Sequence, residues 1–299
     1  MRLKEICEKR LAIIENIRVK VNSLMVGEKP SAMKGLGIDV EDFREYVYGD
    51  DFRHIDWKIT AKIPYYDTPR FYVKEYREEK SLNTFVLLDS SSSMQMGEKW
   101  VTALGALIFF IETARRFKDR IGLLTIGVET PLVISPTSPV GLSEYIMSKA
   151  CKGKIYPRGV LGLEESIRKI IPFLTHRMYV VLVTDIAHEY DEFKNSIRLL
   201  KERVNGLAVV LIVEPRELEL PPIGLAVLND YETPHNISML SGDDVQTASA
   251  YLKRHLRLLE NMLRTYTIPY VKVSHYREIP YAIKKMIEIY SIARVAAYV

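Results

Sequence analysis

The pattern of apolar and polar positions along the chain changes at about residue 83. Residues 3–25 place apolar residues on one face at helical spacing, with charged residues between them, which predicts an amphipathic helix. From Asn83 onward, short apolar runs alternate with longer helical patterns. The short runs predict strands at residues 84–88, 121–126, 132–135, 178–184, 207–213, 226–228 and 270–273. The longer patterns predict helices at residues 99–117, 141–150, 163–174, 191–204, 243–266 and 279–293.

Strands that alternate with helices at this spacing are typical of the α/β class. We therefore expect residues 83–299 to form a doubly wound, mostly parallel sheet with helices on both faces. Residues 1–82 are expected to contribute the N-terminal helix and a polar segment, in which residues 70–77 alternate like a strand.

The strongest candidate for a binding site follows the expected strand at residues 84–88. Asp89, Ser91 and Ser93 offer a carboxylate and two hydroxyls at alternate positions of one turn. Hard oxygen ligands of this kind suit Mg²⁺ or Mn²⁺. Asp185 follows the expected strand at residues 178–184. Both acids would then meet at one edge of the sheet, where α/β proteins bind ligands.

Two alternatives stay open for these residues. Asp89 and the serines could instead cap the following helix, because their side-chain oxygens can accept hydrogen bonds from free amides. A metal-dependent hydrolase or phosphoryl-transfer enzyme could also use the same strand-end carboxylates. Against an enzyme, the sequence has no glycine-rich phosphate loop, and we expect no histidine near Asp89 or Asp185.

A polar and aromatic segment at residues 34–79, here called the strap, precedes the α/β pattern. Its acids and bases are interleaved with aromatic residues, and arginine can both bind carboxylates bidentately and stack on rings. The candidate residues are Arg44, Tyr46, Asp50, Asp51, Arg53, Asp56 and Trp57. They would either tie the N-terminal helix to the sheet or form a docking surface for a partner. We expect no catalytic centre here, because no nucleophile–base pair is evident.

Composition narrows the class of protein. The 299 residues are 47% hydrophobic with a formal net charge of +4 and no dense basic block, which argues against nucleic-acid binding. We expect no membrane span, because the longest apolar stretch, residues 103–111, is well short of the ~20 residues that a membrane helix needs. Cys7 and Cys151 are expected to be isolated thiols, which favours a reducing, cytoplasmic location.

The pattern Asp89-x-Ser91-x-Ser93, with Asp185 after a later strand, resembles the metal-ion-dependent adhesion site (MIDAS) of von Willebrand factor A domains. The resemblance implies a Rossmann-type fold in which Asp89, Ser91 and Ser93 are ligands of Mg²⁺ or Mn²⁺ and Asp185 acts through water. That family usually adds a threonine from a middle loop. The corresponding stretch here, residues 158–163, contains no hydroxyl.

The strap carries a second resemblance. Its residues match the string typical of the domain-of-unknown-function family fifty-eight, which places a von Willebrand factor A-like domain after the strap. The matching residues are Phe43, Arg44, Tyr46, Gly49, Asp50, Asp51, Arg53, Ile55, Asp56, Trp57, Ala61, Val73, Lys74 and Glu75. Lys62 departs from the pattern, because the family usually has arginine there. The resemblance implies association with a MoxR-type AAA+ ATPase, because members are commonly encoded beside such ATPases.

The residues and the resemblance together predict a non-enzymatic, divalent-cation-dependent interaction or adaptor protein. It would work with a MoxR-type AAA+ ATPase in the assembly or maturation of a client. The alternatives are the metal-dependent enzyme described above and a structural scaffold with an empty metal site.

Overall fold

Two units account for the residues described in this computed structural model. The described residues are 3–27, 42–62, 70–75, 81–219, 226–229, 237–240, 242–275 and 278–298. The larger unit combines Met1–Gly27 with Ser81–Val299, and the smaller unit is Glu28–Lys80. The N-terminal helix therefore belongs to the α/β unit, whereas the sequence pattern grouped it with the strap in residues 1–82.

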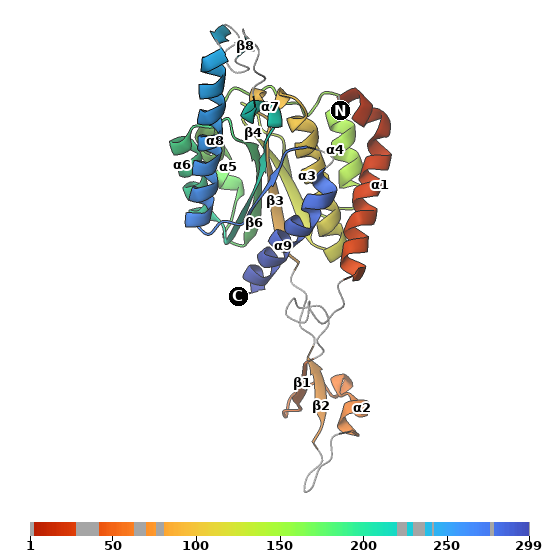
Figure 1. The fold of residues 1–299 in the computed structure, drawn as a ribbon. Coiled ribbons are helices and arrows are strands. Elements are labelled where there is room, and N and C mark those ends of the chain that lie inside the picture. Colours follow the sequence, from red (N-terminus) through yellow and green to blue (C-terminus); the bar gives the residue numbers. More distant parts are fainter. Residues whose placement is uncertain are drawn as a thin grey trace. The chain divides into compact units, whose positions relative to one another are not determined.

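A six-stranded sheet forms the centre of the larger unit (Figure 1). Its strands lie in the order β10 (Tyr270–Val273), β7 (Gly206–Ile212), β6 (Met178–Asp185), β3 (Asn83–Asp89), β4 (Arg120–Ile126) and β5 (Val133–Thr137). All neighbouring pairs are parallel except β4 and β5. Numbered along the chain and read from β5, this is the order 3-2-1-4-5-6 of a doubly wound sheet. The expected α/β class with a mostly parallel sheet is confirmed.

Helices cover both faces of this sheet (Figure 1). One face packs against α3 (Lys99–Phe117), α4 (Leu142–Cys151) and α9 (Ile279–Tyr298). The other packs against α5 (Leu163–Ile170), α6 (Tyr190–Arg203) and α8 (Gly242–Thr265). The central strands are thus buried on both faces, which explains why they are continuous apolar runs rather than alternating ones.

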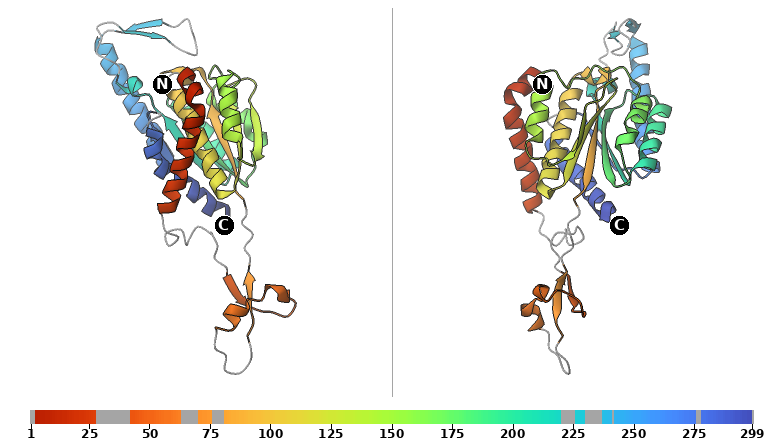
Figure 2. Two further views of the ribbon diagram at one scale, coloured as in Figure 1. Left: turned by 90° about the vertical axis from the view of Figure 1, so that its right-hand side faces the viewer. Right: turned by 180° about the vertical axis from the view of Figure 1, so that it is seen from behind.

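The N-terminal helix α1 (Leu3–Gly27) forms a further layer outside α3 and α4 (Figure 2). Ile14, Ile17 and Val21 lie on its buried face, in agreement with the helical spacing of the sequence. Because α3 is enclosed between the sheet and α1, nearly all of its side chains are buried. This position explains why the sequence of α3 is apolar nearly all round.

A cluster of charged side chains also holds α1 against its neighbours. Arg18 donates from Nε and Nη2 to Glu112 on α3 at 2.8 and 3.2 Å, and from Nη2 to Glu144 on α4 at 3.0 Å. Ser143 on α4 donates to Glu112 at 2.6 Å. The Glu112 side chain is only 2% exposed, so these partners replace the water that would otherwise solvate its carboxylate.

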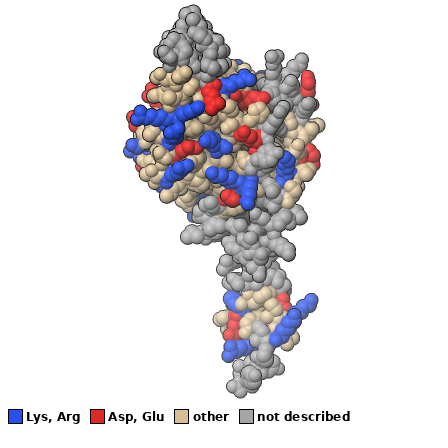
Figure 3. Space-filling model, in the orientation of Figure 1, with Lys and Arg blue, Asp and Glu red and all other residues tan. Residues whose placement is uncertain are grey.

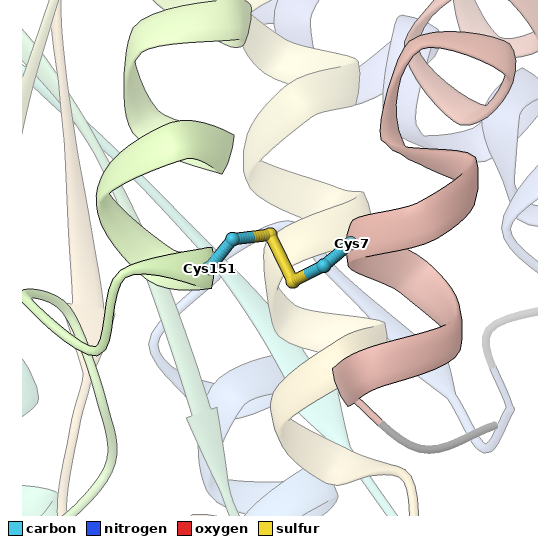
Figure 4. The surroundings of a disulfide bond; sticks show 2 residues. All are labelled: Cys7 and Cys151. Carbon is cyan, nitrogen blue, oxygen red and sulfur yellow. A yellow bond between two sulfur atoms is a disulfide. The ribbon is translucent and has the colours of Figure 1, made fainter.

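A disulfide joins α1 to the end of α4. Cys7 and Cys151 are bonded, with their Cα atoms 5.6 Å apart and 144 residues of separation along the chain (Figure 4). The expectation of two isolated thiols is therefore wrong. The argument for a reducing compartment loses its basis, because it depended on those thiols.

The smaller unit is built on a two-stranded antiparallel sheet, β1 (Asp42–Glu45) with β2 (Tyr72–Glu75). β2 falls within the expected strand at residues 70–77, whereas β1 was not expected. Between these strands lie η1 (Phe52–His54) and α2 (Trp57–Thr60).

Several strap candidates have local structural roles within the smaller unit. Asp51 accepts a hydrogen bond from Arg53 N at the start of η1. Asp56 accepts from the first backbone amides of α2 and so caps that helix. Arg44 binds both oxygens of Asp50 at 2.6 and 2.7 Å, and this pair holds the pKa of Asp50 below its usual range, at about 2.

Two aromatic strap residues differ in their surroundings. Trp57 is exposed and meets Phe71 edge to face, with ring centroids 6.0 Å apart. Tyr46 is half-buried, and its backbone N–H donates to Phe71 O at 2.7 Å. These contacts are internal to the unit, so the choice between a structural strap and a docking surface stays a prediction.

A third, small sheet lies outside the central one. β8 (Ala226–Asn229) pairs antiparallel with β9 (Ile237–Leu240). The expected strand at residues 226–228 therefore exists but does not join the main sheet. A short helix, α7 (Pro215–Leu218), follows β7. Its Glu217 pairs with Lys99 near the carboxyl edge of the main sheet.

Candidate metal centre

The carboxyl ends of β3 and β6 are neighbours, and both strands end in aspartate. Leu88 pairs with Val183 in the parallel register, so Asp89 lies beside Thr184 and Asp185 follows one residue later. In a sheet of this order, the strand order reverses between these two strands, and doubly wound proteins bind ligands in the crevice at that point. The ligand atoms of Asp89, Asp185 and His188 lie within 4.8 Å of one another.

Asp89 is buried, and both of its oxygens take part in hydrogen bonds. Oδ1 accepts from Ser91 N at 2.8 Å. Oδ2 accepts from Thr184 Oγ1 at 2.5 Å and lies 2.8 Å from His188 Nε2. Burial raises the pKa of Asp89, but His188, Thr184 and Ser91 together outweigh it, and the pKa lies below its ordinary value. Burial lowers the pKa of His188, but the carboxylates of Asp89, Asp185 and Glu192 together outweigh it and raise the pKa to about 9.

The two serine hydroxyls of the motif lie on the loop after β3, here called the serine loop (residues 90–95). Ser91 is buried and Ser93 half-buried, and their Oγ atoms are 3.0 Å apart. Ser91 stands at the N-cap of η2 (Ser92–Gln95) without a side-chain capping bond, and the N-cap of α3 is Glu98. Capping of these helices therefore does not account for the serine hydroxyls.

A glycine of the middle loop supports the serine loop through its backbone. Gly159 N donates to Ser90 O at 2.9 Å, and Gly159 O accepts from Ser92 N and Oγ at 2.8 and 3.0 Å. A Cβ atom at residue 159 would lie 1.8 Å from Gly127 O. Gly127 therefore leaves no room for a side chain at residue 159, which supports the serine loop through its backbone alone.

A buried lysine occupies one side of Asp185. Lys99, in the first turn of α3, donates from Nζ to Asp185 Oδ2 at 2.7 Å and also pairs with Glu217 on α7. The other oxygen of Asp185 accepts from Ala187 N at 3.0 Å. Burial lowers the pKa of Lys99, but Asp185 and Glu217 outweigh it, and the pKa lies above its ordinary value. Lys99 is therefore a permanent cation at this edge of the sheet.

The donor set fits a divalent cation on the side of the serine loop. The Asp89 carboxylate and the hydroxyls of Ser91 and Ser93 are hard oxygens on one short turn, as Mg²⁺ and Mn²⁺ prefer. Both carboxylates already take part in hydrogen bonds, Asp89 with Ser91 N, Thr184 and His188. The oxygens of Asp185, in the same cluster, accept from Lys99 and a backbone amide. Direct binding through Asp185 would therefore compete with the ammonium group.

Sequence reasoning missed three members of this cluster. The expectation that no histidine lies near Asp89 or Asp185 is wrong, because His188 follows Asp185 by three residues and contacts Asp89. That proximity was visible in the sequence. Lys99 and Glu217 come from two other elements, α3 and α7, and no local pattern connects them with Asp185.

Comparison with known proteins places the chain in a family. The family model described as "Protein of unknown function DUF58" matches residues 42–257. The chain belongs to this family. The uncharacterized protein Rv1480 of Mycobacterium tuberculosis is 26% identical over 225 residues, which cover 73% of this chain and 68% of the relative.

Solved structures show only distant similarity. BatB from Bacteroides thetaiotaomicron is 14% identical with a TM-score of 0.38, over 70% of this chain and 99% of BatB. The SpRpn10 VWA domain is 19% identical with a TM-score of 0.33, over 44% of this chain and 75% of that domain.

The matched residues contain most of the strap and the candidate metal centre. Residues 42–257 include Asp89, Lys99, Asp185 and Glu217, whereas α1 and α9 lie outside the match. Among the helices in the described part of the chain, none is both long and apolar enough to span a membrane. On the face of the larger unit shown in Figure 3, basic and acidic side chains are intermixed.

Proposed function

We propose that this chain is a non-enzymatic interaction protein whose larger unit is a von Willebrand factor A-like domain with a divalent-cation site. The observation that carries the proposal is the convergence of Asp89 and Asp185 at the switch point between β3 and β6, with the paired hydroxyls of Ser91 and Ser93 on the loop that directly follows Asp89. Asp89 and the two hydroxyls would hold Mg²⁺ or Mn²⁺, with Asp185 acting through water. The bound cation would supply a positive centre that accepts a carboxylate from a partner protein.

A hollow beside the serine loop supports a partner-binding role for this face. It has a volume of about 320 Å³, and Ser90 and Gly159 contribute to its lining. Lys154 and Arg158 are exposed at the hollow, whereas its acid, Glu129, pairs with Lys169 at 3.1 Å. Its apolar lining includes Leu132, Tyr156 and Val160. A partner segment with acidic and apolar side chains would complement this surface.

The partner that we propose is a MoxR-type AAA+ ATPase acting on a client under assembly or maturation. This choice rests on the family resemblance of the strap and not on a contact within the structure. An oligomeric ATPase presents the same acidic side chains on a repeated surface. Its cycle could make and break contacts with the cation.

A binding assay with purified ATPase tests the proposal. Asp89→Asn keeps the shape of the side chain but removes its charge, and we expect at least tenfold weaker binding, or about 1.4 kcal/mol. Asp191→Asn is the matched control, because Asp191 is an exposed acid on α6. Variants should be compared at constant Mg²⁺, since ATPases themselves use Mg²⁺-bound nucleotide and a chelator would act on both proteins. Equal binding of both variants would contradict the proposal.

The hollow can be tested in the same assay. Arg158→Glu reverses one charge at its rim, and we expect weaker binding together with a reduced dependence on salt. Arg198→Glu on α6 is the control, because Arg198 is likewise exposed but lies outside the hollow. If Arg158→Glu left binding unchanged, the partner would approach the serine loop from another direction.

One observation favours a second candidate, a metal-dependent hydrolase. His188 contacts both Asp89 and Thr184, so a titratable imidazole stands at the carboxylates. A phosphatase and nuclease screen with Mg²⁺ or Mn²⁺ separates the two functions. Turnover that disappears in both Asp89→Asn and His188→Gln would support the enzyme and overturn the non-enzymatic proposal.

A further inference from the structure

The side chain of Lys99 lies where an ammonium group is unfavourable unless nearby carboxylates compensate its charge. Its side chain is 1% exposed and belongs to the first turn of α3. Burial removes the ammonium from water, and the dipole of a helix disfavours a cation at its N-terminus. Two carboxylates compensate for both effects, Asp185 from β6 and Glu217 from α7.

These contacts hold the positive charge of Lys99 directly against Asp185, one of the acids of the candidate metal centre. Asp185 belongs to the cluster with Asp89 and His188, and its Oδ2 already accepts from Lys99. A divalent cation near Asp185 would either displace the ammonium or experience its repulsion. Both effects act against occupancy of the site.

We propose that Lys99 is a built-in cation that competes with a divalent cation for Asp185 and keeps divalent binding weak. The inference rests on the proposed cation site at Asp89, Ser91 and Ser93. The affinity of an oxygen-ligand site for a hard cation rises with the number of negative ligands. Lys99 lowers that number by neutralising Asp185.

Glu217 has the opposite effect on the same balance. Its carboxylate shares the charge of Lys99, because it pairs with the same Nζ atom. Loss of Glu217 would leave the full positive charge directed at Asp185 and at any cation nearby. Substitution of Lys99 and of Glu217 should therefore change divalent affinity in opposite directions.

Mn²⁺ titration of the purified chain tests this inference without any partner or substrate. Binding is measured by isothermal calorimetry and by the electron paramagnetic resonance signal of free Mn²⁺. We expect Lys99→Met to bind Mn²⁺ at least tenfold more tightly than the wild type, or about 1.4 kcal/mol. The gain should be lost when Asp89→Asn is added. Lys201→Met is the control, because Lys201 is an exposed lysine of α6 whose Nζ bonds Tyr266 O.

A measurement on Glu217 does not depend on the stability of Lys99→Met. We expect Glu217→Gln, which keeps the contact between Lys99 and Asp185, to bind Mn²⁺ at least threefold more weakly than the wild type. Where Lys99→Met folds, Mn²⁺ should raise its melting temperature more than that of the wild type, because the cation replaces the missing counter-charge. Glu217→Gln binding as tightly as the wild type, or more tightly, would overturn the inference.

The outcomes separate this inference from the proposed function. If the wild type binds Mn²⁺ through Asp89 and Lys99→Met binds it no more tightly, Lys99 is only a structural counter-ion and the proposed function stands. If no variant binds Mn²⁺, the cation site fails and the inference fails with it.

Discussion

Removal of the disulfide between Cys7 and Cys151 should lower the stability of the larger unit by about 4 kcal/mol while leaving its fold intact. The perturbation is the double variant Cys7→Ser/Cys151→Ser, compared with the oxidised wild type. The disulfide is the covalent link between α1 and α4, and the enclosed chain contains the whole of the smaller unit. Its removal therefore frees a long loop in the unfolded state.

The magnitude follows from the length of that loop. The two cysteines are 144 residues apart, and the loop-entropy relation gives about 5 kcal/mol for closing a loop of that size at 25 °C. Removal of a native disulfide typically costs about 2–5 kcal/mol, because real unfolded chains retain some structure. A loss of about 4 kcal/mol lies within both limits. For a unit of this size it corresponds to a fall in melting temperature of roughly 8–16 °C.

The non-covalent contacts of α1 explain why the fold should persist. Ile14, Ile17 and Val21 are each at most 4% exposed, and burial of one such side chain contributes about 1.5–3 kcal/mol. Arg18 adds its paired contacts with Glu112. We therefore expect the far-ultraviolet circular dichroism spectrum of the double variant to match that of the wild type.

Guanidinium denaturation provides the measurement. The midpoint should fall and the slope m should rise in the double variant, because an uncrosslinked unfolded chain exposes more surface. Wild-type protein with reductant should match the double variant, and the double variant itself should not respond to reductant. A thiol titration under denaturing conditions establishes whether the wild type contains the bond.

Two results would refute the reasoning. Two reactive thiols in unreduced wild-type protein would mean that the bond does not form in solution. A bonded wild type whose stability exceeds that of the double variant by less than about 1 kcal/mol would mean that the loop-entropy argument fails for this chain.

Three further predictions concern single residues. Gly159→Ala should weaken Mn²⁺ binding and lower the melting temperature, because the new Cβ would meet Gly127 O at 1.8 Å and push the middle loop off the serine loop; unchanged values for both would show that the loop can move at little cost. Arg18→Met should lower the free energy of unfolding in urea by about 3 kcal/mol. This is near the lower end for breaking a buried pair, because Glu112 keeps Arg115 and a serine hydroxyl. A loss below about 1 kcal/mol would contradict the role of Arg18 in holding α1 against α3. Asp56→Ala should cost about 0.5–2 kcal/mol of local stability, seen as faster hydrogen exchange of the capped amides of α2, and unchanged exchange would argue against the cap.

The periodicity of the sequence predicted most of the fold. The helix at residues 99–117 and the central strands appear close to the expected positions, because burial on one or both faces imposes a repeat that local sequence records. β1 and β9 were missed, because their residues, DFRE and ISML, show no clear alternation of apolar and polar positions. The antiparallel direction of β5 also depended on its partner and not on its own residues.

The candidate site was predictable only in part, because some of its contacts join residues that are far apart in the sequence. Asp89 and Asp185 each follow an apolar strand, so the general rule for strand ends in α/β sheets was enough to bring them together. That rule could not show that Asp89 is bonded to His188, or that Asp185 is engaged by Lys99. Those pairings join residues from different elements, and their distances exist only after the helices have packed on the sheet.

Sequence by itself thus determined the α/β class, the alternation of strands and helices and the position of the serine loop. It also determined the string of strap residues that resembles a known family. Each of these features is set by neighbours along the chain. Tertiary structure decided the bond between Cys7 and Cys151, the place of α1 in the larger unit and the ammonium group beside Asp185. These features join residues from separate elements, and only the packing of the core brings such residues within reach of one another.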